Sequence, residues 1–131
     1  MKTISIVVPC YNEEAVLPST LETLEGFLRG LVQKGRVSSD SSLVFVDDGS
    51  RDRTWELIET ASRESGQIEG IKLSRNRGPQ NALLAGLLTV GGDAVISIDA
   101  DLQDDPRVIE KMIDLFDQGK EIVYGVRSSR E

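Results

Sequence analysis

Two aspartates, Asp99 and Asp101, stand one residue apart directly after the apolar run 94–98. A run of this kind is typical of a strand buried in a parallel sheet, and open α/β sheets bind ligands beyond the carboxyl ends of their strands. Crowded carboxylates repel each other unless a cation neutralises them, and their hard oxygen atoms suit Mg²⁺ or Mn²⁺. The first hypothesis is therefore a divalent metal that carries a phosphate.

The composition argues against several other kinds of chemistry. The chain has no histidine, which removes the commonest general base, histidine-activated nucleophiles and histidine-bound zinc. The formal net charge of -7 argues against a nucleic-acid partner, because proteins that bind phosphate backbones carry clustered lysine and arginine. The single cysteine, Cys10, fits a reducing cytoplasm, and no second cysteine or histidine is present to activate its thiol. Catalysis would depend on carboxylates, arginines and a bound ion.

The length of 131 residues predicts a single domain, since domains commonly have roughly 100 to 200 residues. No apolar stretch approaches the roughly 18 residues that a membrane-spanning helix needs. The chain begins directly with a strand pattern, so no signal peptide is expected. These features favour a cytoplasmic domain.

Strand and helix patterns alternate along the chain. Five short apolar runs have the pattern of strands: 4–8, 43–46, 71–73, 94–98 and 122–124. Three segments between them have apolar residues at helical spacing: 17–31, 55–61 and 106–119. A fourth helix, rich in small residues, is predicted from Pro79 to about Leu88. Pro9 is predicted to end the first strand, and Asp52 to be the N-cap of the second helix. The alternation predicts an α/β fold with a mostly parallel sheet and helices on both faces.

Polar sequence follows four of the five predicted strands, at residues 9–13, 47–50, 74–78 and 99–103. In a parallel sheet these four loops project from the same edge. A lone acidic pair is usually a turn or a helix cap, but four converging polar loops favour a binding site.

Several side chains in these loops have two interpretations. One of Asp47 and Asp48 is expected to cap the following helix, and the other, by preference Asp48, to accept hydrogen bonds from a base or ribose. Tyr11 either stacks on a nucleobase or packs beneath the first loop. Glu13 is either a helix-start carboxylate or a ribose contact.

Arginines and one amide complete the set of candidates. Arg75 and Arg77 follow the third predicted strand, and Arg127 and Arg130 follow the fifth. Guanidinium groups pair well with phosphate, whereas the competing interpretations are solvated loop arginines and a disordered tail. Gln103 either donates or accepts next to the metal or is a simple loop amide.

The chain resembles the family-2 glycosyltransferases of the GT-A fold, specifically the branch that transfers sugars to polyprenyl phosphate or dolichyl phosphate. The resemblance covers essentially the whole chain, and the segments that carry it are 8–14, 46–54, 74–78, 81–86 and 99–104. Their order and spacing together are far more specific than any one segment. The resemblance implies a Rossmann-like, nucleotide-diphospho-sugar transferase fold.

The resemblance also implies a site for a UDP- or GDP-sugar. The donor-binding residues would be Pro9, Tyr11, Glu13, Asp48, Arg75 and Asp99. Asp101 and Gln103 would hold Mg²⁺ or Mn²⁺ with the diphosphate. Arg127, assisted by Arg130, would face an acceptor phosphate, so that Asp101 and Arg127 are the expected catalytic residues. Relatives commonly have an aromatic residue in place of Arg77 and a proline in place of Asp105.

The implied reaction is an inverting glycosyl transfer. The metal and the arginines would neutralise the leaving nucleoside diphosphate while the acceptor attacks the anomeric carbon from the opposite face. Polyprenyl phosphate is the expected acceptor, since its oxygen is already anionic and needs no strong base, in agreement with a chain without histidine. The alternative acceptor is a saccharide hydroxyl, as in cell-wall or polysaccharide synthesis, and it would need a carboxylate base from beyond residue 131.

By the same resemblance, residues 1–131 would be the N-terminal, nucleotide-sugar-binding part of a catalytic domain that continues past Glu131. The fragment is expected to bind nucleotide more readily than to turn over substrate. Membrane contact would come only through the full-length protein, at the cytoplasmic face. Two alternatives of another class are a noncatalytic nucleotide-binding module and a Mg²⁺-binding receiver domain, although receivers place their acidic pair after the first strand, where this chain has 9–12.

Overall fold

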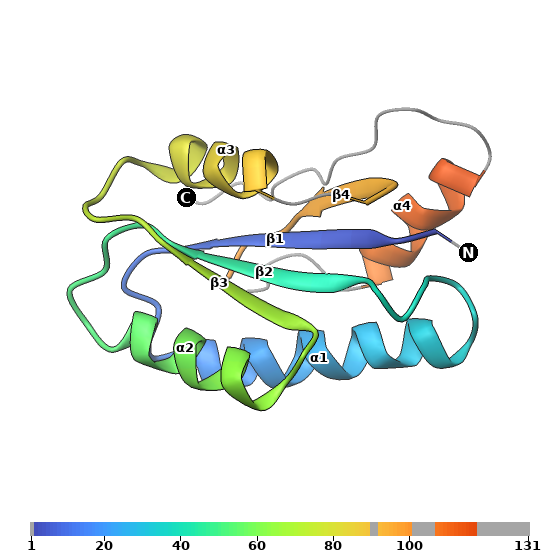
Figure 1. Cartoon of the computed structure of the whole chain (residues 1–131), viewed down its shortest axis with the longest axis horizontal. Helices are drawn as coiled ribbons and strands as arrows, with labels where there is room; N and C mark the ends of the chain where they lie inside the picture. Colours follow the sequence, from blue (N-terminus) through green and yellow to red (C-terminus); the bar gives the residue numbers. More distant parts are fainter. Residues whose placement is uncertain (1, 90–91, 101–106, 118–131) are drawn as a thin grey trace.

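The computed structural model describes residues 2–89, 92–100 and 107–117. Strands and helices alternate, as the sequence predicts (Figure 1). The elements are β1 (Ile4–Cys10), α1 (Leu17–Gln33), β2 (Ser42–Asp47), α2 (Thr54–Glu64), β3 (Ile68–Lys72), α3 (Pro79–Thr89), β4 (Ala94–Ser97) and α4 (Arg107–Asp117). The predicted strand 122–124 lies outside the described residues.

The four strands form one parallel sheet in the order β3-β2-β1-β4. β1 is central and pairs with β2 from Ser5 to Cys10 and with β4 from Ile4 to Val7. β2 also pairs in parallel with β3. Because all strands point the same way, the loops that follow them leave from one edge of the sheet, which we call the carboxyl edge. The predicted parallel α/β fold is confirmed.

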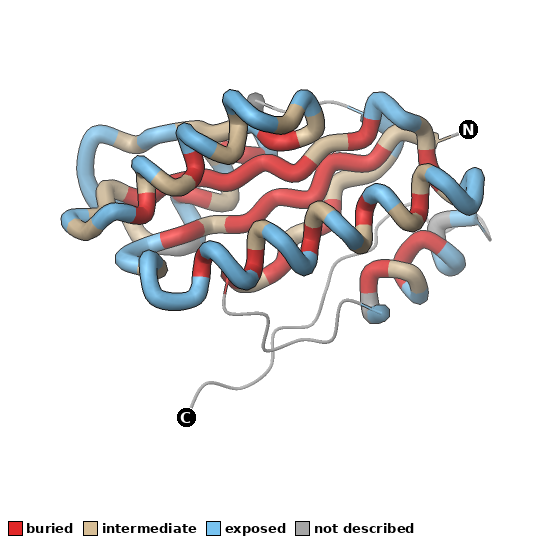
Figure 2. Tube along the Cα trace, turned by 90° about the horizontal axis from the view of Figure 1, so that it is seen from below, coloured by how far each residue is buried: buried red, intermediate tan, exposed pale blue. Residues whose placement is uncertain are grey.

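Helices cover both faces of the sheet, and the strand residues alternate between them. Ile4, Ile6 and Val8 of β1 belong to the core beneath α1, α2 and α4, whereas Val7 belongs to the smaller cluster beneath α3. Figures 1 and 2 show buried strands between the α1–α2 layer and α3. Burial on both faces explains why β1 and β2 are mostly apolar runs rather than alternating ones, whereas β3, at the edge of the described sheet, includes Glu69 and Lys72.

α1 packs on the sheet through one stripe of its surface, formed by Leu17, Thr20, Leu24, Leu28 and Leu31. The spacing of three and four residues places these side chains on one face of the helix. Four members are leucines, and Thr20 is the exception. None of the helices that the structure describes is both long and apolar enough to cross a membrane.

Pro9 does not end the first strand, contrary to the prediction. β1 continues to Cys10, and Pro9 pairs in register with Val46. The backbone groups of β1 face β2 and β4 alternately: the Cys10 carbonyl accepts the Asp48 N–H on the β2 side, and the Val7 carbonyl accepts the Ile98 N–H on the β4 side. Pro9 faces the β4 side, where pairing has stopped at Val7, so its missing N–H interrupts no ladder bond.

Candidate functional site at the carboxyl edge

Three loops meet at the carboxyl edge: the first loop (residues 11–16), the second loop (48–53) and the third loop (73–78). The second loop follows β2 and hydrogen-bonds both of the others. The predicted convergence is therefore present for these three loops, and side chains of the second loop and of the start of α2 maintain it. The fourth predicted loop, 99–103, is described only as far as Ala100.

The first loop is held by four hydrogen bonds from its backbone or side chains to residues 50–54. Asn12 has a left-handed backbone, with φ of 52°; its N–H donates to Ser50 Oγ at 2.8 Å, and its Oδ1 accepts the Arg51 N–H at 2.8 Å. The Glu13 N–H donates to Thr54 Oγ1 at 2.8 Å. The Glu14 N–H donates to Asp52 Oδ2 at 3.2 Å. These contacts fix the backbone of residues 12–14, directly after Tyr11.

The third loop is held by the carboxylate of Asp48. Asp48 is 2% exposed; its Oδ1 accepts the Arg77 N–H at 2.7 Å and its Oδ2 accepts the Gly78 N–H at 3.0 Å. Gly49 lies against the same loop, because a Cβ atom there would be 2.4 Å from the Arg75 carbonyl carbon. Each oxygen of Asp48 keeps lone-pair capacity for a further donor, so the proposed contact with a base or ribose stays a prediction.

Asp52 is not the N-cap of α2, contrary to the prediction. The helix begins at Thr54 and its N-cap is Arg53, which makes no side-chain capping bond. Asp52 Oδ1 accepts the Thr54 N–H at 2.9 Å and also the Thr54 hydroxyl. Burial would raise the pKa of Asp52, but the bonds from Thr54 and from the Glu14 N–H outweigh it and hold the pKa below its ordinary value.

Asp47 and Cys10 are buried side by side at the ends of β2 and β1. Asp47 is 0% exposed, and its Oδ1 accepts the Ser50 N–H at 3.2 Å while Oδ2 has no hydrogen bond within the described residues. Burial, followed by the negative charges of Glu13 and Asp47, raises the pKa of the Cys10 thiol far above its ordinary value. This environment agrees with an inert thiol.

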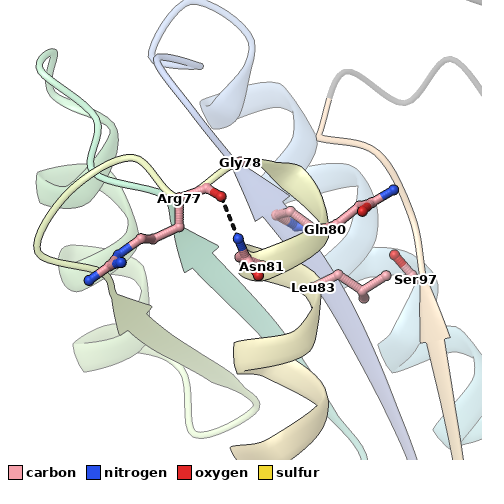
Figure 3. A pocket seen from close by; sticks show the side chains of 7 residues that line it. Arg77, Gly78, Gln80, Asn81, Leu83 and Ser97 are labelled. Atoms are coloured by element: carbon pink, nitrogen blue, oxygen red, sulfur yellow. Dashed lines mark hydrogen bonds between the residues drawn. The ribbon is translucent and has the colours of Figure 1, made fainter.

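A pocket of about 340 Å³ opens beside the third loop, at the ends of β1 and β4. Its lining is Pro9, Arg77, Gly78, Gln80, Asn81, Leu83 and Ser97 (Figure 3). The Asn81 side-chain amide donates to the Arg77 carbonyl oxygen at 2.7 Å, which ties the start of α3 to the third loop. The guanidinium of Arg77 extends away from Gln80 and Ser97, so its backbone and side-chain stem face the pocket.

The structure places the predicted donor residues along this edge. Pro9 lines the pocket, Tyr11 is 41% exposed in the first loop, and Arg75 is exposed in the third loop. Asp99 follows β4 and is half-buried. The remaining predicted site residues lie outside the described residues: Asp101, Gln103, Arg127 and Arg130.

Three polar lining residues were missed by the sequence reasoning: Gln80, Asn81 and Ser97. Gln80 and Asn81 stand at the start of a helix, in the first turn that often contributes polar groups to a site. Ser97 interrupts the apolar β4 sequence two residues before Asp99. A small polar residue in an otherwise apolar strand was the signal that could have identified Ser97 as a pocket residue.

The metal hypothesis depends on residues outside the described part of the chain. Within the residues that the structure describes, no three acidic or cysteine side chains are grouped so that they could hold a metal ion. The predicted ligands Asp101 and Gln103 are not among them. The nearest described position is Ala100, whose carbonyl oxygen accepts the hydroxyl of Thr20 at 2.6 Å.

A second hollow lies between α1 and α2. Its volume is about 380 Å³, and Pro18, Leu21, Leu57 and Ala61 contribute its apolar lining, with Arg53, Glu56, Thr60 and Glu64 around them. The lining contains none of the predicted donor residues.

Comparison with known proteins gives a family and a set of relatives. A sequence model of the family described as Glycosyl transferase family 2 matches residues 5–131. The uncharacterised glycosyltransferase YkoT of Bacillus subtilis (strain 168) is 48% identical over 130 residues, which cover 98% of this chain and 39% of that protein. An undecaprenyl-phosphate 4-deoxy-4-formamido-L-arabinose transferase of Pseudomonas paraeruginosa is 41% identical over 128 residues, which cover 97% of this chain and 36% of that protein. The chain thus spans less than two fifths of these relatives.

Solved structures show the same fold. Glucosyl-3-phosphoglycerate synthase from Mycobacterium tuberculosis, in complex with Mn²⁺, UDP and glucosyl-3-phosphoglycerate, matches with a TM-score of 0.66 and 24% identity over 88% of this chain and 39% of that chain. A mannosyltransferase from Pyrobaculum calidifontis, in complex with GDP-Man and Mn²⁺, matches with a TM-score of 0.61 and 21% identity over 76% of this chain and 28% of that chain. At these identities the likeness concerns the fold alone.

Proposed function

Since this chain belongs to glycosyl transferase family 2, we propose that its carboxyl edge holds the nucleotide of a UDP- or GDP-sugar donor. The observation that carries the proposal is the pocket of about 340 Å³ at the ends of β1 and β4, bordered by the third loop that Asp48 holds. A pocket of this size, in which Pro9 and Leu83 stand beside the polar side chains of Gln80, Asn81 and Ser97, suits a nucleoside.

The donor would contact residues from the strand ends and from the loops at the carboxyl edge. Pro9 and Ser97 form the floor, and Tyr11, exposed in the first loop, is available to stack on a base. Asp48, Glu13 and Asp99 would accept hydrogen bonds from the base and ribose. Arg75 is exposed and makes no ion pair within the described residues, so its charge is available to the diphosphate.

A divalent metal, Mg²⁺ or Mn²⁺, is the proposed cofactor. Asp101 and Gln103 would hold it, and it would supply charge neutralisation for the leaving diphosphate. Two structurally similar transferases bind Mn²⁺ together with UDP or GDP-Man, which supports the proposal.

Polyprenyl phosphate is the proposed acceptor, with Arg127 and Arg130 as its phosphate contacts. The support is the 41% identity to an undecaprenyl-phosphate sugar transferase. In the whole protein, the reaction would then take place at the cytoplasmic face of the membrane, where the lipid headgroup is accessible. A saccharide hydroxyl is the second candidate acceptor. Residues 1–131 would form the nucleotide-sugar-binding part of the catalytic domain.

Calorimetric titration with UDP and GDP, each in Mn²⁺ and in EDTA, tests the donor proposal, with ADP as the control nucleotide. We expect UDP or GDP to bind in Mn²⁺ and to bind at least about tenfold more weakly in EDTA. Asp101→Ala should abolish the metal dependence. Asp40→Ala, at an exposed position just before β2 and so at the opposite edge, should leave it intact.

Two results would overturn the proposal. One is the absence of binding for both UDP and GDP in either condition. The other is stable phosphorylation of an aspartate by acetyl phosphate, which would identify a receiver domain instead.

A further inference from the structure

Thr20 is a buried polar residue in a stripe of leucines. It occupies the α1 position between Leu17 and Leu24 that faces the core, and it is 2% exposed. A leucine at this position would extend the apolar stripe, whereas a buried hydroxyl without a hydrogen bond costs free energy. Core packing alone therefore does not explain why this position is a threonine.

The hydroxyl of Thr20 donates to the carbonyl oxygen of Ala100 at 2.6 Å. Ala100 is itself 2% exposed and lies three residues beyond the end of β4, where the ladder with β1 has stopped. Within the described residues no strand pairs with Ala100, and Thr20 supplies a hydrogen-bond donor to its buried carbonyl. The two residues are 80 positions apart in sequence, so the contact is purely tertiary.

Ala100 is the middle residue of Asp99-Ala100-Asp101. The carbonyl oxygen of Ala100 belongs to the rigid peptide unit that follows this residue, so the bond from Thr20 restrains that unit directly. Through Ala100 it also restrains the backbone that leads back to Asp99. The segment is tied to α1, which is itself fixed to the core by four leucines.

We propose that Thr20 is a positioning residue for donor binding: its hydroxyl holds the Ala100 carbonyl and thereby fixes the backbone beside Asp99 at the carboxyl edge. This inference rests on the donor site proposed above. Thr20 does not touch the donor. It is buried and acts through the backbone of residue 100.

The test compares Thr20→Val, Thr20→Ser and Thr20→Cys with wild type, using UDP and GDP in Mn²⁺ as the probes. Valine keeps the shape but removes the donor, serine keeps the hydroxyl, and cysteine keeps only a weak S–H donor. We expect nucleotide affinity to fall about three- to tenfold in Thr20→Val, to fall less in Thr20→Cys and to return to within about twofold in Thr20→Ser. Thr23→Val, at an exposed position of the same helix, is the matched control and should bind like wild type.

A second measurement separates positioning from simple stability. In the absence of nucleotide and metal, hydrogen exchange of the segment 98–103 should accelerate about three- to tenfold in Thr20→Val, while exchange of β1 and β2 stays unchanged. Because this readout and the serine rescue do not depend on global stability, a residue that merely contributed to folding would not produce the pattern.

The outcomes distinguish the two proposals. If wild type binds nucleotide and Thr20→Val binds it with the same affinity, the role of Thr20 is overturned and the donor site stands. The same holds if Thr20→Val loses affinity and Thr20→Ser does not restore it. Failure of wild type to bind either nucleotide overturns the donor site and the inference with it. If Thr20→Val does not fold, the nucleotide affinities of Thr20→Cys and Thr20→Ser are compared instead. Equal affinities of these two variants would contradict a positioning role for the Thr20 hydroxyl.

Discussion

Gly49 lies so close to Arg75 that a Cβ atom at position 49 would be 2.4 Å from the Arg75 carbonyl carbon and 2.7 Å from its Cα atom. The contact joins the second loop to the third loop, backbone against backbone. Asp48, one residue earlier, holds the next part of that loop through the Arg77 and Gly78 N–H groups. The Asp48-Gly49 pair therefore determines where the third loop, and the pocket beside it, can lie.

Gly49→Ala should destabilise the protein by at least about 2 kcal/mol. The backbone φ of 72° is strained for alanine, and the new Cβ would overlap backbone atoms that cannot rotate away. Urea unfolding measures the loss. Gly66→Ala is the control, since nothing lies within 4 Å of a Cβ there, and it should stay within about 0.5 kcal/mol of wild type. Equal stability of the two variants would refute the close contact.

Asp48→Asn should loosen the third loop. An asparagine has one acceptor oxygen, whereas the aspartate uses both oxygens for the Arg77 and Gly78 N–H groups. The amide nitrogen of the asparagine then faces one of these two groups. The Arg77 N–H would lose its acceptor, at a cost of about 1 to 3 kcal/mol, whereas the Gly78 N–H would keep Asn76 Oδ1 at 2.9 Å as a second acceptor. Amide exchange at residues 77 and 78 should accelerate. Unchanged exchange at both amides would show that the carboxylate does not hold this loop.

The contribution of Asp52 to the stability of the protein should be lost at acidic pH. Its pKa is lowered in the folded protein, so the ionised form is favoured by folding. The stabilisation is complete above the ordinary aspartate pKa of about 3.9 and is lost as the pH falls through the lower folded-state value. The difference in melting temperature between wild type and Asp52→Ala should be constant from pH 7 to 5 and shrink below about pH 4. A difference that grows toward acid would contradict this sign.

Cys10 should resist alkylation in the folded protein. Burial and the charges of Glu13 and Asp47 raise its pKa, so the reactive thiolate is scarce even at alkaline pH. Iodoacetamide at pH 8.5 should label Cys10 only after unfolding in urea, with mass spectrometry as the readout. Rapid labelling of the native protein would mean that the end of β1 opens readily to solvent.

The order of strands and helices could be predicted from the sequence because β1, β2 and β4 are mostly apolar runs and α1, α2 and α4 each have one apolar stripe. The shared carboxyl edge followed from the parallel arrangement alone. The position of Pro9 inside β1 could not be predicted, because it depends on β4 pairing no further than Val7. How far β4 pairs with β1 cannot be read from the sequence of β1 itself.

The different hydrogen-bond partners of Asp48 and Asp52 in the second loop also could not be predicted from the sequence. Asp52 was predicted as a helix cap, yet its side chain also accepts the Glu14 N–H of the first loop. Asp48, whose nucleotide contact stays a prediction, holds two N–H groups 29 and 30 residues away, which the sequence did not indicate. Such bonds depend on how three loops pack together in space. Thr20 belongs to the same class, since its partner Ala100 is 80 residues away.

Hydrogen–deuterium exchange of the chain with and without UDP or GDP, in Mn²⁺, tests the central claim most directly. If the donor nucleotide binds at the carboxyl edge, protection should appear at residues 9–13, 75–81 and 97–103. The hollow between α1 and α2, around Leu21 and Leu57, should exchange at the same rate in both states and serves as the internal reference. Protection confined to that hollow, or no protection at the carboxyl edge with nucleotide bound, would contradict the account.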